Sequence, residues 1–387
     1  MSEVFNLVVG SDNGNSEHDL VINGTVVKQP NVYAMATILA NLDEVNPDYV
    51  AKNIHSNLLV SIESPSVNSN MPATYYIGNM AIESGNYIHN IEIGVDNNKL
   101  TSNIPVINTL AHTAGFAAAQ AYEKDNTVRQ IDVNIDMTTA LPVNQYNKET
   151  AKTMAEKFIG EHIVTVYFGT TKVRCMLHFT YVKVLPEGVP TVFYLKSPEG
   201  KKLIPEIKSL DNKKILHVAI GEGTTEYPVT TDITFNPFFM AGTNNGIGHA
   251  IDKIIEQFKK EKKLADFSRQ NFSNVLKNDT HKYHKSAMEI IQMPLMEQAD
   301  QILRAIKAEV VKAKNDIDFI LVYGGGSILL RKYLENQLKE FANNAEIQVI
   351  YIPSTHAVEV EALGLYKFAK SDIFAQLKEK YTTVSQK

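Results

Sequence analysis

Apolar residues in the first thirty positions fall into three short runs separated by polar turns. Leu7–Val9 and Leu20–Ile22 flank a turn of Gly, Asp, Asn and Ser residues, and Asn23-Gly24 then leads into a third run, TVVKQP. An Asn-Gly pair between two apolar runs is a strong signal for a tight turn. The pattern therefore predicts a three-stranded meander whose first turn is rich in small polar residues.

The rest of the first half alternates between strand and helix periodicity. Apolar spacing predicts a long helix in NIPVINTLAHTAGFAAAQAYEKDN and another from about residue 148 to 159. It favours short helices in NVYAMATIL and after Gly78. Strands are predicted in NLLVSIES, ATYYIG, RQIDVNIDMTTALPV, HIVTVYF and KVRCMLHFTYVKVL.

The second half repeats the opening architecture without repeating its sequence. KILHVAIGEGTTEYPVTTDITF predicts a strand, a glycine-rich turn and a strand, like residues 5–22. DFILVYGGGSILLRKYLENQLKEF predicts a buried strand, three glycines and a helix. IQVIYIPS is a predicted strand, and helices are expected in GIGHAIDKIIEQFKKEK, LADFSRQNFSNVL, MEQADQILRAIKAEVVKAK and AVEVEALGLYKFAKS. No short repeat period occurs, which argues against a solenoid or a propeller.

Composition and charge exclude several classes of protein. The length of 387 residues predicts two or three domains, and a hydrophobic content of 44% is typical of globular proteins. The net charge of −5 disfavours direct nucleic-acid binding. The first ten residues do not resemble a signal peptide, and no apolar run reaches the roughly 18 residues that span a membrane. The single cysteine, Cys175, is expected in a buried strand in a reducing compartment. We therefore expect a soluble, cytoplasmic protein.

Three glycine-containing turns follow apolar strands and share one chemical property. They are GSDNGNS (10–16), GEGTTE (221–226) and YGGGS (323–327). Glycine lets backbone amides approach an anion closely, and a helix N-terminus also favours negative charge. Each turn alone is a weak signal, since the P-loop motif is absent and GEGTTE does not open a helix. Together they indicate a phosphate-binding site.

The order of these motifs resembles that of the actin-like ATPases, in particular the bacterial plasmid-segregation actins of the ParM-like group. VVGSDNGN and AIGEGTTE are similar to the two phosphate loops, and FILVYGGGS to the adenosine loop. Further similar segments, in chain order, are YYIGNMA, TALPVNQY, VKVLPEGVP and HAVEVEALGLYKFA. The resemblance spans about 350 residues.

The resemblance implies an α/β, actin-like (ASKHA) fold, in which two lobes, each a mixed sheet flanked by helices, enclose a nucleotide cleft. Domain I is expected to comprise residues 1–212 and 358–387, with a smaller inserted subdomain near 31–74. Domain II is expected to comprise residues 213–357.

The resemblance also assigns site residues. Glu187, between two prolines in LPEGVP, is the expected catalytic residue, which holds the attacking water. The expected nucleotide-binding residues are Asp12, Asn13, Gly14, Asn15, Ser16, Gly221, Glu222, Gly223, Thr224, Thr225, Gly324, Gly325, Gly326 and Ser327.

One departure from the family pattern concerns the metal. The second phosphate loop of the family commonly begins with Asp, where this chain has Ala219. Asp12 and, through water, Glu222 are therefore the expected ligands of Mg²⁺, which binds few protein carboxylates and keeps several waters. The alternative is that Glu222 is only a solvent-exposed turn residue.

The implied function is an actin-like ATPase that binds ATP-Mg and hydrolyses it as it assembles into dynamic head-to-tail filaments that move or segregate plasmid DNA. GTP remains open beside ATP as the nucleotide. The expected partners are further copies of the chain and a centromere-binding adaptor of the ParR type, with no direct nucleic-acid or membrane contact. The alternatives are a cytoskeletal or phage-encoded actin homologue with another cargo, or a small-molecule kinase of the same fold.

The C-terminal segment leaves two readings open. Ile373, Phe374, Leu377 and Tyr381 form a narrow apolar stripe at helical spacing. We expect this stripe to pack on domain I, with a membrane anchor as the alternative. Gln145, in TALPVNQY, is the reserve candidate for the water-holding residue if Glu187 proves not to serve.

Overall fold

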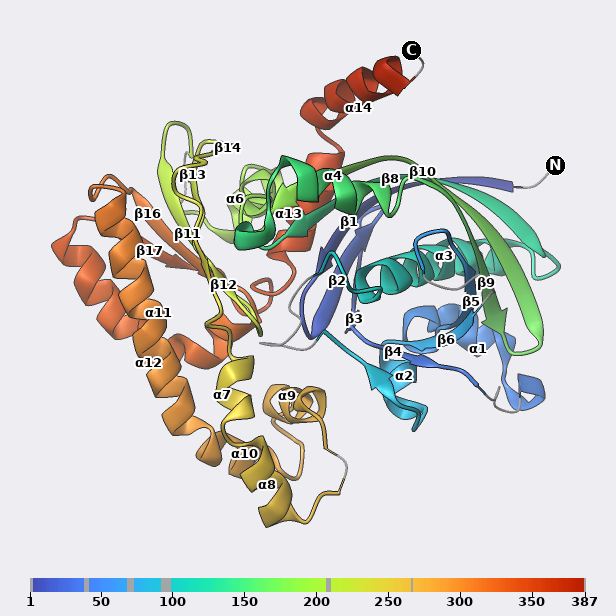
Figure 1. Ribbon diagram of the computed structural model, residues 1–387, viewed down its shortest axis with the longest axis horizontal. Helices are drawn as coiled ribbons and strands as arrows, with labels where there is room; N and C mark the ends of the chain where they lie inside the picture. The colour runs from blue at the N-terminus through green and yellow to red at the C-terminus, as the bar shows by residue number, and fades with distance from the viewer. Residues whose placement is uncertain are drawn as a thin grey trace.

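The first half of the chain folds around a ten-stranded mixed sheet (Figure 1). The computed structural model describes residues 3–37, 42–67, 73–91, 99–206, 210–265 and 267–385. The strand order is β3-β2-β1-β8-β10-β9-β5-β6-β4-β7. The strands are β1 (Glu3–Asn13), β2 (Glu17–Ile22), β3 (Thr25–Pro30), β4 (Tyr33–Met35), β5 (Leu59–Glu63), β6 (Ala73–Ile77), β7 (Ile88–His89), β8 (Gln130–Leu141), β9 (Gly160–Phe168) and β10 (Thr171–Pro186).

Two helices sandwich the centre of this sheet, where β1, β8 and β10 run parallel. Side chains alternate between the two faces of a strand, and neighbouring residues of β1 meet different helices. Gly10 lies against the backbone of Tyr366 in α13 (Val360–Ala369), whereas Ser11 contacts Thr109 in α3 (Ile104–Lys124). α3 is buried along nearly its whole length, which explains its apolar sequence.

The second sheet is organised around β11 (Lys214–Ile220). On one edge β11 runs parallel to β16 (Phe319–Tyr323), which pairs with β17 (Gln348–Tyr351). On the other edge it pairs antiparallel with β13 (Val229–Thr231) and then, near its end, with β12 (Thr225–Glu226). Pro228, which has no amide hydrogen, separates these two short strands. The outer strands are β14 (Thr234–Phe235) and β15 (Gly242–Thr243).

Helices cover the second sheet and connect the elements of both. In Figure 1, α11 and α12 lie beside the second sheet, on the opposite side of the molecule from α3. The remaining helices are η1 (Leu42–Glu44), α1 (Pro47–Lys52), η2 (Ile54–Ser56), α2 (Asn79–Glu83), η3 (Val143–Gln145), α4 (Lys148–Glu156), α5 (Thr191–Leu195), α6 (Pro198–Leu203), α7 (Gly248–Asp252), α8 (Ile255–Lys262), α9 (Arg269–Lys277), α10 (His284–Ile290), α11 (Gln292–Lys312), α12 (Gly325–Asn344) and α14 (Asp372–Ser385).

The fold class predicted from the sequence is confirmed: two mixed sheets, each flanked by helices. The proposed division at residues 212 and 357, with a subdomain near 31–74, stays a prediction. Two local expectations differ from the structure. β4 occupies residues 33–35, within the segment 31–39 where a short helix was favoured and of which residues 38 and 39 lie outside the described part. The helix expected from residue 246 is divided into α7 and α8.

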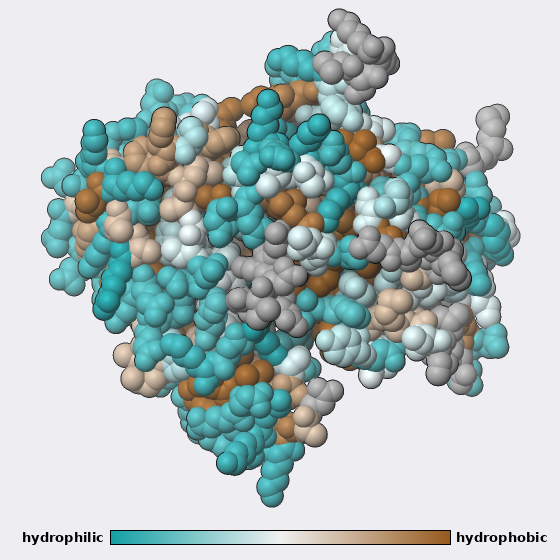
Figure 2. Space-filling view, in the orientation of Figure 1, coloured by the Kyte–Doolittle hydropathy of each residue, from teal (hydrophilic) through white to brown (hydrophobic). Residues whose placement is uncertain are grey.

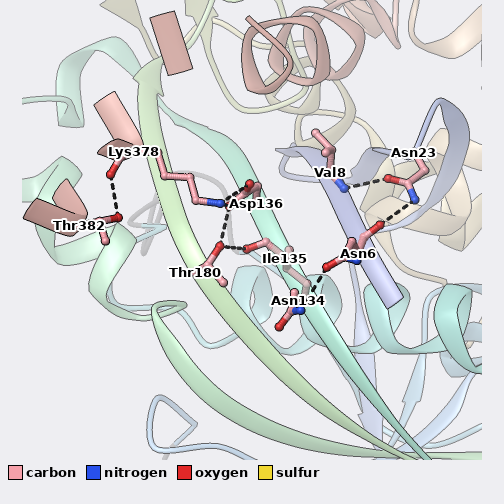
Figure 3. Close-up of polar contacts among 9 residues, drawn as sticks. All are labelled: Asn6, Val8, Asn23, Asn134, Ile135, Asp136, Thr180, Lys378 and Thr382. Carbon is pink, nitrogen blue, oxygen red and sulfur yellow. Dashed lines mark hydrogen bonds and ion pairs between the residues drawn. The ribbon is translucent and has the colours of Figure 1, made fainter. Parts of the chain in front are cut away.

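The C-terminal helix α14 packs against β10, as expected from its apolar stripe. Phe374 is buried beside Tyr181, which also contacts the ring of Tyr381. Figure 3 shows the ionic part of this contact: Lys378 Nζ lies 2.6 Å and 2.7 Å from the carboxylate oxygens of Asp136, which also accepts from Thr180. Within the described residues, no helix has the length and apolar character needed to cross a membrane.

Candidate functional site

A cavity of about 450 Å³ lies where the ends of β1, β10, β11 and β16 meet. All three glycine turns line it, although they are far apart in the sequence. The predicted site residues that line it are Asp12, Gly14, Asn15, Ser16, Glu187, Gly221, Glu222, Gly223, Thr224, Gly324, Gly325 and Gly326. The structure thus gathers most of the predicted residues into one site.

Three other predicted residues are not among the described residues that line the cavity. Asn13 turns its amide to Ser11 Oγ (3.0 Å), and Thr225 donates its hydroxyl to the carbonyl of Asn245 (2.9 Å). Ser327 donates to the carbonyl of Gly324 (2.7 Å). These side chains support the turns internally, and a direct contact of theirs with nucleotide stays a prediction.

The first turn (residues 10–16) is supported by buried polar side chains. Ser11 Oγ lies 2.9 Å from His18 Nε2, and Asn31 donates its amide to the carbonyl of Gly14 at 2.6 Å. Burial, together with the nearby charge of Lys99, lowers the pKa of His18 to about 3, so this histidine is neutral. A neutral hydrogen-bonded network therefore fixes the backbone of the turn.

Asp12 lies near the end of β1, and its carboxyl group is close to other acidic groups. Burial raises the pKa of Asp12 to about 7, with Lys99 lowering it and Glu187 and Glu17 raising it. A carboxyl group held this way gains most from a nearby cation, because a cation restores the charged form.

The second turn (residues 221–226) is held through its backbone. The carbonyl groups of Gly221, Glu222 and Gly223 accept from the amides of Ile247 (3.1 Å), Gly248 (2.8 Å) and Gly246 (3.2 Å), respectively. His249 Nε2 also lies 3.1 Å from the carbonyl of Gly223. The residues at the start of α7 therefore fix this turn, and the side chain of His249 adds to their backbone contacts.

Glu222 is only 9% exposed, so it is not a solvent-exposed turn residue. Burial raises its pKa, and a hydrogen bond with Ser16 opposes that shift. This bond joins the first turn to the second directly. The two turns therefore lie within hydrogen-bonding reach of each other.

The third turn (residues 323–327) approaches β11 closely. Gly324 has φ of +89°, and a Cβ at this position would lie 2.4 Å from the carbonyl oxygen of Ile220. Only glycine fits both constraints, so it lets α12 begin directly at the cavity. The N-terminus of α12 thus presents the partial positive charge of its helix dipole to the site.

Glu187 lies at the end of β10 and is held from several sides. Its amide donates to the carbonyl of Leu141 (2.8 Å), and the next amide, of Gly188, donates to the carboxylate of Glu361 (2.9 Å). Lys99 Nζ lies 2.5 Å from Glu187 Oε1. The backbone of the predicted catalytic residue is fixed, and its side chain is paired with a buried lysine.

Sequence reasoning missed several charged residues that line the same cavity. They are Glu17, Asp19, Lys28, Lys99, Glu226, Lys277 and Glu361. Burial raises the pKa of Glu226 to about 8, with Glu187 adding to the shift. Glu226 and Glu361 lie within segments that resemble family motifs, so the sequence could have pointed to them. Lys99 lies in no such segment.

Arg269 is a charged residue on a helix that borders the cavity. The structure places it in α9, where its guanidinium forms two hydrogen bonds with Asp252, at 2.7 Å and 2.6 Å. Its neighbours in α9 at Ser273, Leu276 and Lys277 line the cavity, but Arg269 is not among the described lining residues.

Two family models match the chain. A model of the N-terminal domain of actin-like proteins matches residues 10–189, and a model of the C-terminal part of archaeal MreB-like actin homologues matches residues 217–336. Among curated protein sequences, none matches. The sequence-based resemblance to actin-like proteins is confirmed.

Solved structures share the fold at low sequence identity. The actin-like protein Alp7A has a TM-score of 0.67 and 18% identity, covering 99% of this chain and 100% of its own. A 15-stranded ParM filament from Clostridium botulinum has a TM-score of 0.64 and 17% sequence identity, and the match covers 95% of this chain and 99% of that chain. Bacillus thuringiensis ParM with ATP has a TM-score of 0.57 and 18% sequence identity, and the match covers 96% of this chain and 99% of that chain.

Proposed function

Because this chain belongs to the actin-like superfamily, we propose that it binds ATP with Mg²⁺ in the cavity between its two sheets and hydrolyses it, with GTP open as a competing nucleotide. The observation that carries this proposal is the meeting of three glycine turns at one cavity. Glycine turns and a helix N-terminus supply backbone donors for phosphate. The volume of about 450 Å³ lies in the usual range for small-molecule sites, about 300–1,000 Å³.

The charges around the cavity suit a nucleotide only together with a cation. The described lining residues include seven carboxyl groups and three lysines. A triphosphate adds about four negative charges, so its binding without a counter-ion would be opposed by repulsion. Asp12 and Glu222 are buried carboxyl groups with raised pKa values and would hold the ion.

Magnesium would need few protein ligands here. No group of three or more His, Cys, Asp or Glu side chains suited to a metal occurs among the described residues. Mg²⁺ commonly uses one or two carboxylates and keeps several waters, which fits Asp12 with Glu222 acting through water. When bound, the ion supplies charge neutralisation at the phosphate oxygens.

Glu187 is the residue that we propose to orient the attacking water molecule. In hydrolysis, a bond forms between the water oxygen and the γ-phosphorus, and the bond from that phosphorus to the β–γ bridging oxygen breaks. The water proton passes to an acceptor, for which we propose the Glu187 carboxylate. Its fixed backbone at the end of β10 holds that carboxylate at the edge of the cavity.

We also propose that the protein assembles head-to-tail into filaments whose stability depends on the bound nucleotide. The similar fold of the Clostridium botulinum ParM filament supports this proposal. Figure 2 shows a face on which hydrophilic residues predominate and hydrophobic ones form separate patches. Heterologous contacts that do not close into a ring generate open filaments.

Segregation of plasmid DNA is the proposed use of such filaments. The net charge of −5 fits a division of labour in which an adaptor of the ParR type touches DNA and the filament does not. A cytoskeletal or phage-encoded actin homologue with another cargo would share the same nucleotide site.

The decisive experiment is polymerisation on addition of ATP and Mg²⁺, followed by light scattering and by pelleting. We expect scattering to rise with ATP and fall as ATP is consumed, and EDTA to prevent the rise. Absence of polymer over a wide range of protein concentration, nucleotide and salt would refute the filament. If phosphate transfer to a small molecule were then found, a kinase of this fold would take its place.

A further inference from the structure

Lys99 is a deeply buried cation inside the cavity. This inference rests on the proposed function: we propose that Lys99 binds the γ-phosphate of ATP and, in doing so, releases Glu187 from the ion pair that holds it. Lys99 would then both bind the triphosphate and make the water-orienting carboxylate available.

The geometry places Lys99 beside several acidic groups of the cavity. It precedes α3 in the chain and is only 3% exposed, while Glu187 is 15% exposed. Its ammonium group lies 2.5 Å from Glu187 Oε1, and both residues line the cavity together with Asp12. A buried ammonium needs a partner, because an unpaired charge in the interior is strongly unfavourable.

The electrostatics keep Lys99 charged. Burial opposes the charge, but Glu187, Asp12 and Glu226 together raise the pKa of Lys99 above its usual range. The ammonium group therefore remains protonated and available to an anion. A lysine is a flexible point charge with three donors, so it can move from one oxygen partner to another.

The other two lysines of the cavity are more exposed and have partners of their own. Lys28 pairs with Glu359 at 2.6 Å and is 36% exposed. Lys277 pairs with Glu17 at 3.0 Å and is 43% exposed. Lys99 is thus the lysine with the driest environment of the three, where attraction to phosphate is screened least.

A terminal phosphate competes with Glu187 for this ammonium. The phosphate has up to two negative charges and three acceptor oxygens, whereas the carboxylate has one charge and two oxygens. While Glu187 is paired with Lys99, one of its oxygens is occupied and its charge is neutralised, so it is a poor acceptor for water. The competing group is the γ-phosphate, which ATP has and ADP lacks. The pair therefore distinguishes the two nucleotides.

The test compares the affinities for ATP and for ADP, each measured with Mg²⁺ by displacement of a fluorescent adenine nucleotide. Lys99→Ala should weaken ATP binding by about 10- to 100-fold, the usual effect of losing a charged contact, and change ADP binding by less than about threefold. Lys28→Ala is the matched control and should leave the ratio of the two affinities unchanged. Lys99→Arg keeps the charge and should restore part of the ATP preference.

A double-mutant comparison tests the competition itself. Glu187→Gln removes the competing charge, so it should tighten ATP binding when Lys99 is present. The same change should have no such effect in Lys99→Ala, because no ammonium is left to compete for. The double variant removes both members of the ion pair, so Glu187 is not left as a charge without its partner, and this variant serves if Lys99→Ala alone fails to fold.

Two results would overturn this role of Lys99. Equal losses of ATP and ADP affinity in Lys99→Ala would show general support of the cavity. The same effect of Glu187→Gln with and without Lys99 would show that the two residues do not compete. Failure of the unmodified protein to bind any nucleotide would instead refute the proposed function, so the two failures are distinguishable.

Discussion

The two sides of the cavity are built on different principles. The side formed by the first sheet presents charged side chains, namely Asp12, Lys99 and Glu187. The side formed by the second sheet presents the glycine turns 221–223 and 324–326. Side-chain groups supply charge and proton acceptors, whereas a fixed backbone supplies donors and shape. Substitutions of the charged side chains should therefore alter chemistry and metal binding, and those of the glycines should alter geometry.

The largest effect is expected at Glu187, on the first side. Glu187→Ala should leave ATP affinity intact or improve it, because the turns proposed to bind phosphate are unchanged. Loss of the water-orienting group should slow phosphate release by about 100-fold or more. Filaments of this variant should assemble with ATP and persist. Phosphate release and light scattering, recorded in the same sample, measure hydrolysis and assembly.

Hydrolysis at the unmodified rate by Glu187→Ala would remove this residue from the mechanism. The next acceptor to test would then be Gln145 in η3, by the same pair of measurements. Glu187→Gln is the matched control, because it keeps the shape of the side chain and loses the proton acceptor.

The next largest effect separates the two carboxyl groups proposed to hold magnesium, one on each side. Asp12→Ala should weaken Mg²⁺-dependent nucleotide binding by about 10- to 100-fold. Glu222→Ala should weaken it less, by under about 10-fold, because its contact runs through water. A titration with fluorescent nucleotide at varied Mg²⁺ measures both. Unaltered binding by both variants would contradict the assignment of these acids.

The contrast between the two sides also explains what the sequence could predict. The glycine turns have local signatures, since an apolar strand followed by small residues is visible in GSDNGNS, GEGTTE and YGGGS. Lys99 has no such signature: its partner Glu187 is 88 positions away, and only the fold brings them together. The same holds for Ser16 and Glu222, whose hydrogen bond joins turns on different sheets. Pairings over long sequence distances were therefore the part that the sequence did not show.

Secondary structure was predicted best where periodicity was long. The helix α3 and the strand β8 extend over many residues of one pattern, and both were predicted. β4 has only three residues, too few to show alternation, and it was mistaken for helix. The break between α7 and α8 near residue 253 has no glycine or proline to mark it.

On the second side, the glycine at position 246 should matter through sterics. A Cβ there would lie 2.1 Å from the carbonyl oxygen of Glu222 and 2.6 Å from the carbonyl carbon of Gly223. Both atoms are backbone, so Gly246→Ala must displace the second turn and should lower the free energy of unfolding by about 1–3 kcal/mol. Chemical denaturation in the absence of nucleotide measures this loss.

Gly325→Ala is the matched control for that experiment. Gly325 also lies in a turn that lines the cavity, but a Cβ there would meet no atom within 4 Å. The free energy of unfolding of Gly325→Ala should be unchanged or slightly higher, because alanine favours the helix that begins at this position. Equal losses for both variants would contradict the steric argument.

The smallest effect is expected at His249, which contacts the second turn but is not among the described residues that line the cavity. Its Nε2 lies 3.1 Å from the carbonyl of Gly223, and three backbone hydrogen bonds hold the same turn independently. His249→Ala should therefore weaken nucleotide binding by only about 1 kcal/mol, the usual contribution of one neutral hydrogen bond. His249→Gln can retain a donor and should recover part of that loss. A loss in His249→Ala as large as that in Asp12→Ala would mean that the second turn depends on side chains as much as the first does.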